Sequence, residues 1–308
     1  MTPVSTTTIP TVSTAIKTRS DILPQITAFK NRMGITKDTI SVKNHEDILE
    51  YAVNKAYIDM QPRTIKGHEI IKTAKLRNDL ADRFFKYFND PAPSTESDFD
   101  KIHSDFCDFF LTELNKIFAS TPQAFGKAQK VINMAFKYLY CFDDATSYLP
   151  HFTYCHMPID SYTLNWCFDN GLYDKKSDIP NWSTLNKRDY YDLCDRIRNK
   201  LPHKSPLIEE FVIWPEEKAK ANEINFIKTI MDYIADNYDL FSSSGITSSG
   251  ISSGPIKPYV EKTVKNKVNT INNDRTKDGK LALDNTTVLS MLSSISTSAL
   301  IAGIAKCI

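Results

Sequence analysis

Helical periodicity runs through most of this chain and constrains its fold more than any other feature. From residue 21 onward apolar residues recur at three- and four-residue spacing, whereas runs that alternate apolar and polar residues, as strands do, are scarce. Ser, Thr, Asp or Asn lies near the start of several such segments, as is common at helix N-termini. The sequence therefore predicts an all-α domain. Its expected helices cover residues 45–58, 64–88, 97–119, 122–141, 161–170, 185–201 and 216–238.

Composition and charge narrow the functional classes. The chain has 308 residues, of which 41% are hydrophobic and 24% charged, and these fractions are typical of a globular protein. The formal net charge is +1, which argues against binding a polyanion through bulk charge. A contact with DNA would therefore need a local basic patch.

The two ends differ in composition from the middle. Residues 1–20 are rich in Thr, Ser and Pro and are expected to form a flexible arm before a helical domain at 21–241. Residues 242–255 read SSSGITSSGISSGP, a low-complexity Ser/Gly linker. The tail at 256–308 is first basic and then apolar. Its basic part is either a DNA-touching segment or solvated charge, and its apolar end is expected to be a docking or partner-binding element.

The cysteines give no sign of a metal site or a disulfide framework. None of the six is spaced as CxxC or CxxxC, so neither zinc nor an iron–sulfur cluster is expected. No secretory signal is evident, and we expect free, buried thiols in a monomer of the reducing cytoplasm, with no cofactor and no membrane association. The six are Cys107, Cys141, Cys155, Cys167, Cys194 and Cys307.

A basic run accompanies the helix expected at 122–141. Between Leu114 and Cys141 there are four lysines and no acidic residue. A turn that contains Gly126 at the start of a helix exposes backbone N–H groups, and flanking lysines would make it suitable for a phosphate. The alternative is a solvated helix face with snorkelling lysines. The four are Lys116, Lys127, Lys130 and Lys137.

An aspartate follows a proline shortly after this helix. Pro158 fixes its own φ and keeps Met157 out of the helical region, so the chain should be extended here. Asp160 can then cap the helix that begins at Ser161. If it also faces a lysine of the preceding helix, the pair could stabilise a cationic sugar while an amine attacks.

The order of these residues resembles that of the helix-hairpin-helix DNA glycosylases. The closest likeness is to the archaeal-type 8-oxoguanine DNA glycosylases and their bacterial relatives, in which a Gln-Lys helix precedes a Pro-Ile-Asp sequence by about thirty residues. Gln129–Lys130 and Pro158–Asp160 match that pattern. The usual Leu-Pro-Gly-Val-Gly hairpin signature is missing, and only Phe125-Gly126-Lys127 stands in its place.

The resemblance implies a base-excising enzyme that acts on double-stranded DNA. Lys130 would attack C1′ as a Schiff-base nucleophile, with or without AP-lyase activity, and Asp160 would activate it. The resemblance also implies a helix-hairpin-helix fold, with Gly126, Lys127 and Gln129 binding DNA. The excised base would be 8-oxoguanine. The aromatic insert at 142–154 leaves open another modified base, for example in invading phage DNA, which would make the protein part of antiviral defence.

Two residues are candidates for the pocket of a flipped base. His156 precedes the Pro-Ile-Asp segment, and Trp214 offers a flat surface that replaces lost stacking. For both, packing in the core is the alternative. Two other functional interpretations remain open. One is a non-catalytic helical protein that binds DNA or a partner. The other is a helical ribonuclease that uses Arg198 and His203, although Pro202 should end the helix before His203.

Overall fold

The computed structural model of the protein describes residues 18–35, 45–202 and 205–236. Regular structure within these ranges is entirely helical, which confirms the predicted all-α class. None of the described helices is long and apolar enough to cross a membrane. Residues 1–17 of the expected arm, the linker at 242–255 and the tail at 256–308 lie outside the described residues.

Contacts divide the chain into two units. The first contains Met1–Thr27 and Ile40–Glu217, and the second contains Ala28–Thr39 and Lys218–Ile308. Helices α1 and α9 each begin in the first unit and continue into the second. All candidate site residues belong to the first unit. The described α-helices are α1 (Leu23–Arg32), α2 (His45–Asp59), α3 (Ala74–Asn89), α4 (Glu96–Ile117), α5 (Phe125–Tyr140), α6 (Leu149–Phe152), α7 (Ser161–Asp169), α8 (Lys187–Lys200) and α9 (Pro206–Asp236).

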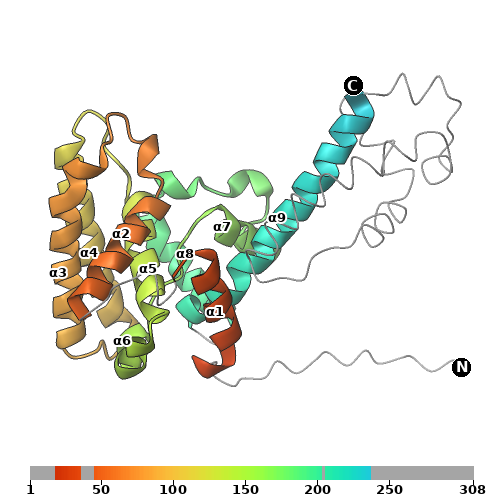
Figure 1. Ribbon diagram of the computed structural model, residues 1–308. Coiled ribbons are helices and arrows are strands. Elements are labelled where there is room, and N and C mark those ends of the chain that lie inside the picture. Colours follow the sequence, from red (N-terminus) through yellow and green to blue (C-terminus); the bar gives the residue numbers. More distant parts are fainter. Residues whose placement is uncertain (1–17, 36–44, 203–204, 237–308) are drawn as a thin grey trace, which may run out of the picture. The chain divides into compact units, whose positions relative to one another are not determined.

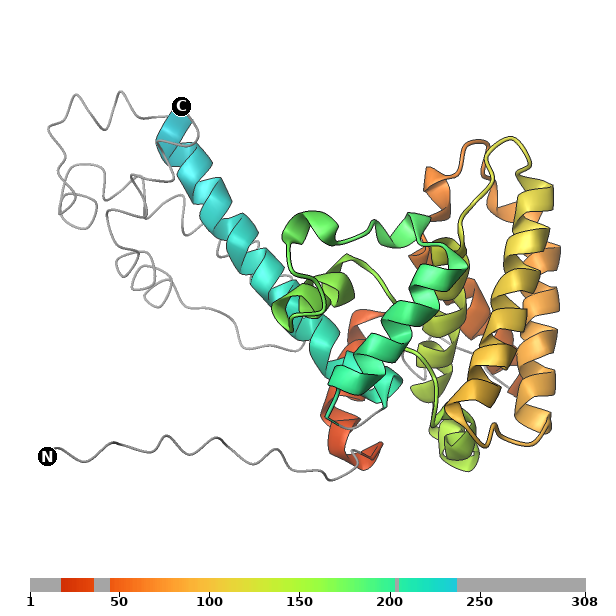
Figure 2. The same ribbon diagram turned by 180° about the vertical axis from the view of Figure 1, so that it is seen from behind.

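Helix α5 is the central element of the first unit. It contacts α2, α4, α8 and the short 3-10 helix η6 (Trp182–Thr184), and Figures 1 and 2 show it among these elements. All sixteen of its residues are buried. Phe136, near its middle, packs edge to face against Phe84 of α3 with ring centroids 5.0 Å apart. The helix therefore has no solvated face, and every polar side chain on it needs a partner inside the protein.

Side-chain caps fix the starts of three of the described α-helices. Thr95 accepts a hydrogen bond from the backbone N–H of Asp98 at 3.1 Å and caps α4. Asn186 accepts one from the N–H of Asp189 at 2.9 Å and caps α8. Asp160 caps α7, as the sequence predicted. Each cap satisfies an N–H group that has no partner within the helix, which stabilises the helix by about 1 kcal/mol.

Two expected helices have different limits. The helix expected at 64–88 is replaced by two short 3-10 helices, η2 (Pro62–Thr64) and η3 (Ile70–Thr73), followed by α3. Gly67 interrupts this stretch, because its φ of 75° is left-handed and ends a right-handed helix. The last helix begins at Pro206 and not at residue 216. Pro206 suits a first turn, and Pro215 lies inside the helix without ending it.

The end of the expected N-terminal arm is attached to the helical unit. Arg19 donates hydrogen bonds to the carbonyl oxygens of Tyr140 and Phe142, at 3.3 and 2.9 Å. These oxygens lie at and just beyond the C-terminal end of α5, where a positive charge is favourable. Residues 18–20 are therefore part of the folded unit, and the flexible arm predicted for 1–20 does not extend to them.

Gly126 allows α5 to approach η6 closely. A Cβ atom built on Gly126 would lie 1.9 Å from the carbonyl oxygen of Trp182. The Gly126 N–H also donates to the Leu185 carbonyl at 2.9 Å. The sequence pattern predicted a turn with N–H groups open to phosphate. Gly126 instead lies in the first turn of α5 and serves close helix packing.

We expect Gly126→Ala to lower the free energy of unfolding by about 3 kcal/mol, because the backbone of η6 would have to move. Gly171→Ala is the matched control. Gly171 has a φ of 75° but open space around a built Cβ, so only backbone strain of about 1 kcal/mol applies. Urea unfolding of both variants measures the difference. Equal losses of unfolding free energy in the two variants would show that the contact between α5 and η6 tolerates a side chain at position 126.

Candidate active site

Lys130 and Asp160 form a buried ion pair. The Lys130 Nζ lies 2.7 Å from Asp160 Oδ2, and the two side chains are 7% and 12% exposed. Lys130 lies in the second turn of α5, and Asp160 is the residue before α7. The resemblance of the Gln-Lys and Pro-Ile-Asp segments implied that these two residues would meet, and they do so in the structure.

The two carboxylate oxygens of Asp160 have separate roles. Oδ1 accepts the backbone N–H groups of Tyr162 at 2.9 Å and Thr163 at 3.1 Å, which caps α7. The Thr163 hydroxyl accepts the Asp160 N–H at 2.7 Å, so the cap is reciprocal. Oδ2 is directed to Lys130 and to the indole N–H of Trp214, which lies 3.0 Å away. The capping hydrogen bonds therefore hold the carboxylate in the orientation that presents Oδ2 to the amine.

The surroundings of Asp160 favour its ionised form. Burial by itself raises the pKa of Asp160. The charge and hydrogen bond of Lys130, the backbone N–H of Thr163 and the indole of Trp214 outweigh burial, and the pKa lies below its ordinary value. The N-terminal end of α7 adds partial positive charge near the same carboxylate. Asp160 is thus a carboxylate held next to an amine.

Trp214 closes one side of the pair. Its indole donates to Asp160 from α9, and its ring meets Tyr162 edge to face with centroids 5.1 Å apart. Both rings are partly exposed, whereas Lys130 and Asp160 are buried. Trp214 thus lies beside the ion pair.

A second buried ion pair lies on the same helix. Lys137 pairs with Glu210 of α9, and both side chains are almost fully enclosed. Burial raises the pKa of Glu210, and Lys137 and Lys130 oppose that rise. Asp59 of α2 accepts a hydrogen bond from Tyr138 at 2.6 Å and also interacts electrostatically with both lysines. Two ammonium groups and three carboxylates therefore share this side of α5.

Lys127 is directed into the protein and not toward a phosphate. Its Nζ donates to the Met60 carbonyl at 2.7 Å and to the Thr64 hydroxyl at 3.0 Å, and it lies 5.2 Å from the centre of the Trp182 ring. Burial lowers the pKa of Lys127. The residue is 6% exposed. These contacts hold the end of α2 and η2 against α5, which differs from the predicted DNA-binding role.

Gln129 is fully buried, and all its hydrogen-bonding groups are used within the protein. Its amide donates to the carbonyl oxygens of Ile159 and Gly126, at 2.8 and 3.0 Å. Its carbonyl accepts the Ile159 N–H and the Asn133 amide, both at 3.1 Å. No polar atom of the side chain is left to reach a ligand, which differs from the predicted contact with DNA.

His156 belongs to a core network and does not line an open pocket. The residue is 1% exposed, and its ring nitrogens lie 2.8 Å from the Tyr190 hydroxyl and 2.8 Å from Asp100. Burial lowers the pKa of His156. Arg198 pairs with the same Asp100 and is 5% exposed. Core packing was the alternative for His156. Because Arg198 is buried too, it is not accessible to an RNA substrate, as the ribonuclease interpretation requires. His203 lies outside the described residues.

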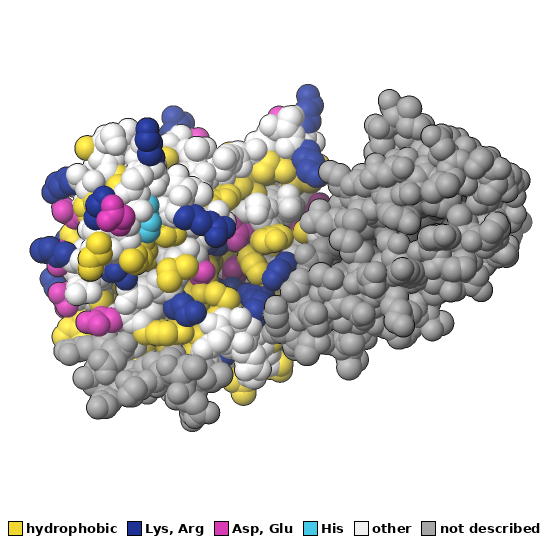
Figure 3. Space-filling model, turned by 45° about the horizontal axis from the view of Figure 1, so that its top comes forward, with side chains coloured by type: hydrophobic (Ala, Val, Ile, Leu, Met, Phe, Trp, Pro, Cys, Tyr) yellow, Lys and Arg dark blue, Asp and Glu magenta, His cyan; other side chains and the backbone are white. Residues whose placement is uncertain are grey.

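The expected basic patch is not formed by the lysine run. Three of its four lysines are inside the protein, and Lys116 pairs with Glu113 at 2.6 Å. On the face shown in Figure 3, the exposed Lys and Arg side chains are scattered among acidic and apolar ones.

Glu210, Tyr162 and Lys137 are neighbours of the Lys130–Asp160 pair that were not predicted from the sequence. An acidic pair, Glu209–Glu210, inside an apolar run was the available signal for Glu210.

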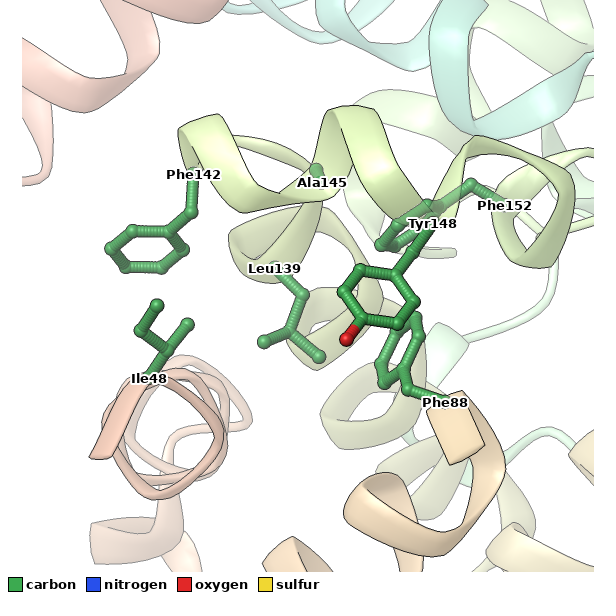
Figure 4. A pocket seen from close by; sticks show the side chains of 7 residues that line it. All are labelled: Ile48, Phe88, Leu139, Phe142, Ala145, Tyr148 and Phe152. Carbon is green, nitrogen blue, oxygen red and sulfur yellow. The ribbon is translucent and has the colours of Figure 1, made fainter. Parts of the chain in front are cut away.

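A pocket elsewhere in the first unit has no charged side chain in its lining. It is lined by apolar and aromatic side chains from α2, α3, α5, α6 and the turn between α5 and α6, with the Tyr148 hydroxyl as the one polar group that Figure 4 shows. The described residues contain no group of three or more His, Cys, Asp or Glu side chains suited to a metal ion. The five described cysteines are free and buried, as expected, and Cys307 lies outside the described residues.

We expect Asp160→Asn to lower the free energy of unfolding by about 3 kcal/mol, because Lys130 would keep a buried charge without its partner. Asn can still cap α7, so the loss reports the ion pair and not the cap. In a Lys130→Met background the same substitution should cost close to nothing. A double-mutant cycle by urea unfolding measures the coupling. Additive losses would show that the pair does not stabilise the fold.

The stability that this pair contributes should also depend on pH. The folded-state pKa of Asp160 lies below its unfolded value of about 3.9, so the contribution is fully present above the unfolded pKa. It is lost as the pH falls through the folded pKa. The stability difference between wild type and Asp160→Asn should therefore be constant from about pH 8 to about pH 5 and shrink below about pH 4. A difference that grows in acid would contradict the assigned charge state.

Comparison with protein-family models gives no match for this chain. No curated protein sequence matches it, and no solved structure does.

Proposed function

We propose that this protein is a DNA glycosylase that excises a damaged or modified base through Lys130. The observation that carries the proposal is the 2.7 Å contact between Lys130 Nζ and Asp160 Oδ2 at a capped helix start. An amine beside a carboxylate that can accept its proton suits nucleophilic attack at a sugar carbon. The resemblance of the Gln-Lys and Pro-Ile-Asp segments to helix-hairpin-helix glycosylases supports the same assignment.

The chemistry follows from the contact between the two groups. Lys130 must be a neutral amine when it attacks C1′, and Asp160 Oδ2 is near enough to accept the ammonium proton directly. The nitrogen then bonds to C1′ while the N-glycosidic bond breaks and the base leaves with the bonding electrons. The proton held on Asp160 is available to the departing base. Once the departing base has taken this proton, Asp160 is again a carboxylate and stabilises the positive charge on the sugar.

A flipped nucleotide would approach from the side of Trp214 and Tyr162. These rings are the partly exposed neighbours of an otherwise buried pair, and they meet edge to face. An aromatic platform replaces the stacking that a base loses when it leaves the duplex. The base is 8-oxoguanine by resemblance, or another modified base, including one carried by phage DNA. The partner in either case is double-stranded DNA.

A non-catalytic role is the second candidate, and one observation favours it. Lys127, Lys130 and Lys137 each have a partner inside the protein, so the Lys130 pair could be one of three structural contacts of α5. The protein would then be a helical module that binds DNA or a protein partner. Formation of a covalent adduct with DNA distinguishes the two candidates.

We expect borohydride to trap a covalent complex between the wild-type protein and duplex DNA that contains the base which the protein removes. The readout is a protein–DNA band in a denaturing gel, and mass analysis of the released base identifies the substrate among oxidised and phage-type modified bases. Lys130→Met should form no adduct, because the attacking amine is missing. Asp160→Asn should keep the cap of α7 but lose at least about 100-fold in rate, as for loss of a catalytic proton-transfer group.

Lys127→Met is the matched control, since it removes a buried lysine one turn away on the same helix. It should still form the adduct through Lys130. If wild-type protein gives no adduct with any modified duplex, or if Lys130→Met gives as much as wild type, the lysine mechanism is wrong and the non-catalytic interpretation is favoured.

A further inference from the structure

The segment that leads to Asp160 lies against α5 as an extended chain. Met157 and Ile159 are buried, and Asp160 has an extended φ of −140°. Buried backbone N–H and C=O groups in an extended segment need hydrogen-bond partners, which a neighbouring strand would supply in a sheet. Here a helix is the neighbour, and the backbone groups of a helix are already used. Side chains of α5 must supply the partners instead.

Gln129 supplies both partners for Ile159. Its carbonyl oxygen accepts the Ile159 N–H at 3.1 Å, and its amide donates to the Ile159 carbonyl at 2.8 Å. A single side chain thus holds one residue from both sides, as a paired strand does. Asn133, one turn further along α5, donates to the Gln129 carbonyl at 3.1 Å and to the Met157 carbonyl at 3.3 Å. The pair fixes the register of the segment against the helix.

Each end of this clamp adjoins a member of the candidate active site. Gln129 precedes Lys130 on α5, and Ile159 precedes Asp160. The distance between the amine and the carboxylate is therefore set through two peptide units, one on each side of the Gln129 carboxamide. Gln129 is 0% exposed and its donors and acceptors are all used, so it is not shared with a ligand.

We infer that Gln129 is the positioning residue of the candidate active site, which holds Asp160 against Lys130 by clamping the backbone of Ile159. This inference rests on the proposed function only for its effect on catalysis. Its effect on the ion pair is independent of any activity.

The test replaces Gln129 by Met, which has a similar size but no donor or acceptor. Asn115→Leu is the matched control, because Asn115 clamps Gln123 in the same way. Its amide donates to the Gln123 carbonyl at 3.2 Å, and its carbonyl oxygen accepts the Gln123 N–H at 2.7 Å. Both variants lose a two-sided clamp of the backbone, but only Gln129→Met loses the one next to Asp160.

The first measurement is a titration of the Asp160 carboxyl by side-chain carbon NMR in the full chain, with Asp160→Asn used to assign the signal. In Gln129→Met the pKa of Asp160 should rise toward its ordinary value of about 3.9, because Lys130 is no longer held against it. In Asn115→Leu it should stay as in wild type. If Gln129→Met does not fold, Gln129→Asn keeps the amide but shortens its reach and should give the same rise. An unchanged titration in the folded Gln129 variant would overturn the inference.

The second measurement is the rate of borohydride trapping. Misplacement of Asp160 should lower this rate by about 100-fold in Gln129→Met while DNA affinity stays the same, and Asn115→Leu should trap like wild type. A Gln129→Met protein that titrates as expected but traps at the wild-type rate would overturn the catalytic part. If wild type traps nothing and the Asp160 titration still shifts, the proposed function fails, whereas Gln129 is confirmed as the residue that positions the ion pair.

Discussion

Three ammonium groups lie inside the described part of the first unit, and the need to provide each with a partner governs how its elements meet. A buried charge without a partner costs several kcal/mol, so the enclosure of α5 is possible only if polar groups from other elements reach its lysines. These groups come from segments that are far apart in the sequence. Lys127 meets the end of α2 and η2, Lys130 meets the start of α7, and Lys137 meets α9. The contacts of the lysines are thus also the contacts that join the helices.

In the proposed reaction, the contact between Lys130 and Asp160 would serve two purposes that usually conflict. A nucleophile must be free to react, whereas a buried ion pair must be held in place to stabilise the fold. Asp160 combines the two because its oxygens are divided. One oxygen is fixed by the backbone of α7, and the other faces the amine. The helix start can therefore remain intact while the second oxygen exchanges a proton.

Local chemistry explains which features could be read from the sequence. Pro158 predicted an extended segment before α7, and Asp160 predicted the cap of that helix, because both features depend on neighbours in the chain. That Lys130 and Asp160 would meet followed from the resemblance, because the segment between α5 and α7 gives no local signal of where it returns. The all-α class followed from periodicity, which is also a local property. The likeness to glycosylases supplied the chemical role, which the structure by itself does not test.

The features that the sequence did not predict depend on enclosure. Periodicity shows that a helix has polar positions but not whether they face solvent, so a lysine run that is buried looks the same as a basic surface. The DNA contact expected of Gln129 came from the resemblance. Its partner in the structure is the backbone of Ile159, which no sequence pattern indicates. Glu210 could not be matched with Lys137 because the two residues lie on helices far apart in the sequence, and no local pattern shows which residues of such helices meet.

The burial of all sixteen residues of α5 also determines how the protein opens. Amide protons on a peripheral helix exchange with solvent when that helix alone detaches, but α5 is in contact with α2, α4, α8 and η6 at once. Its protons become accessible only when several of these elements separate and three ion or dipole contacts break together. The central helix should therefore exchange at the rate of global unfolding of the first unit, and its slowest amides measure the whole stability of that unit.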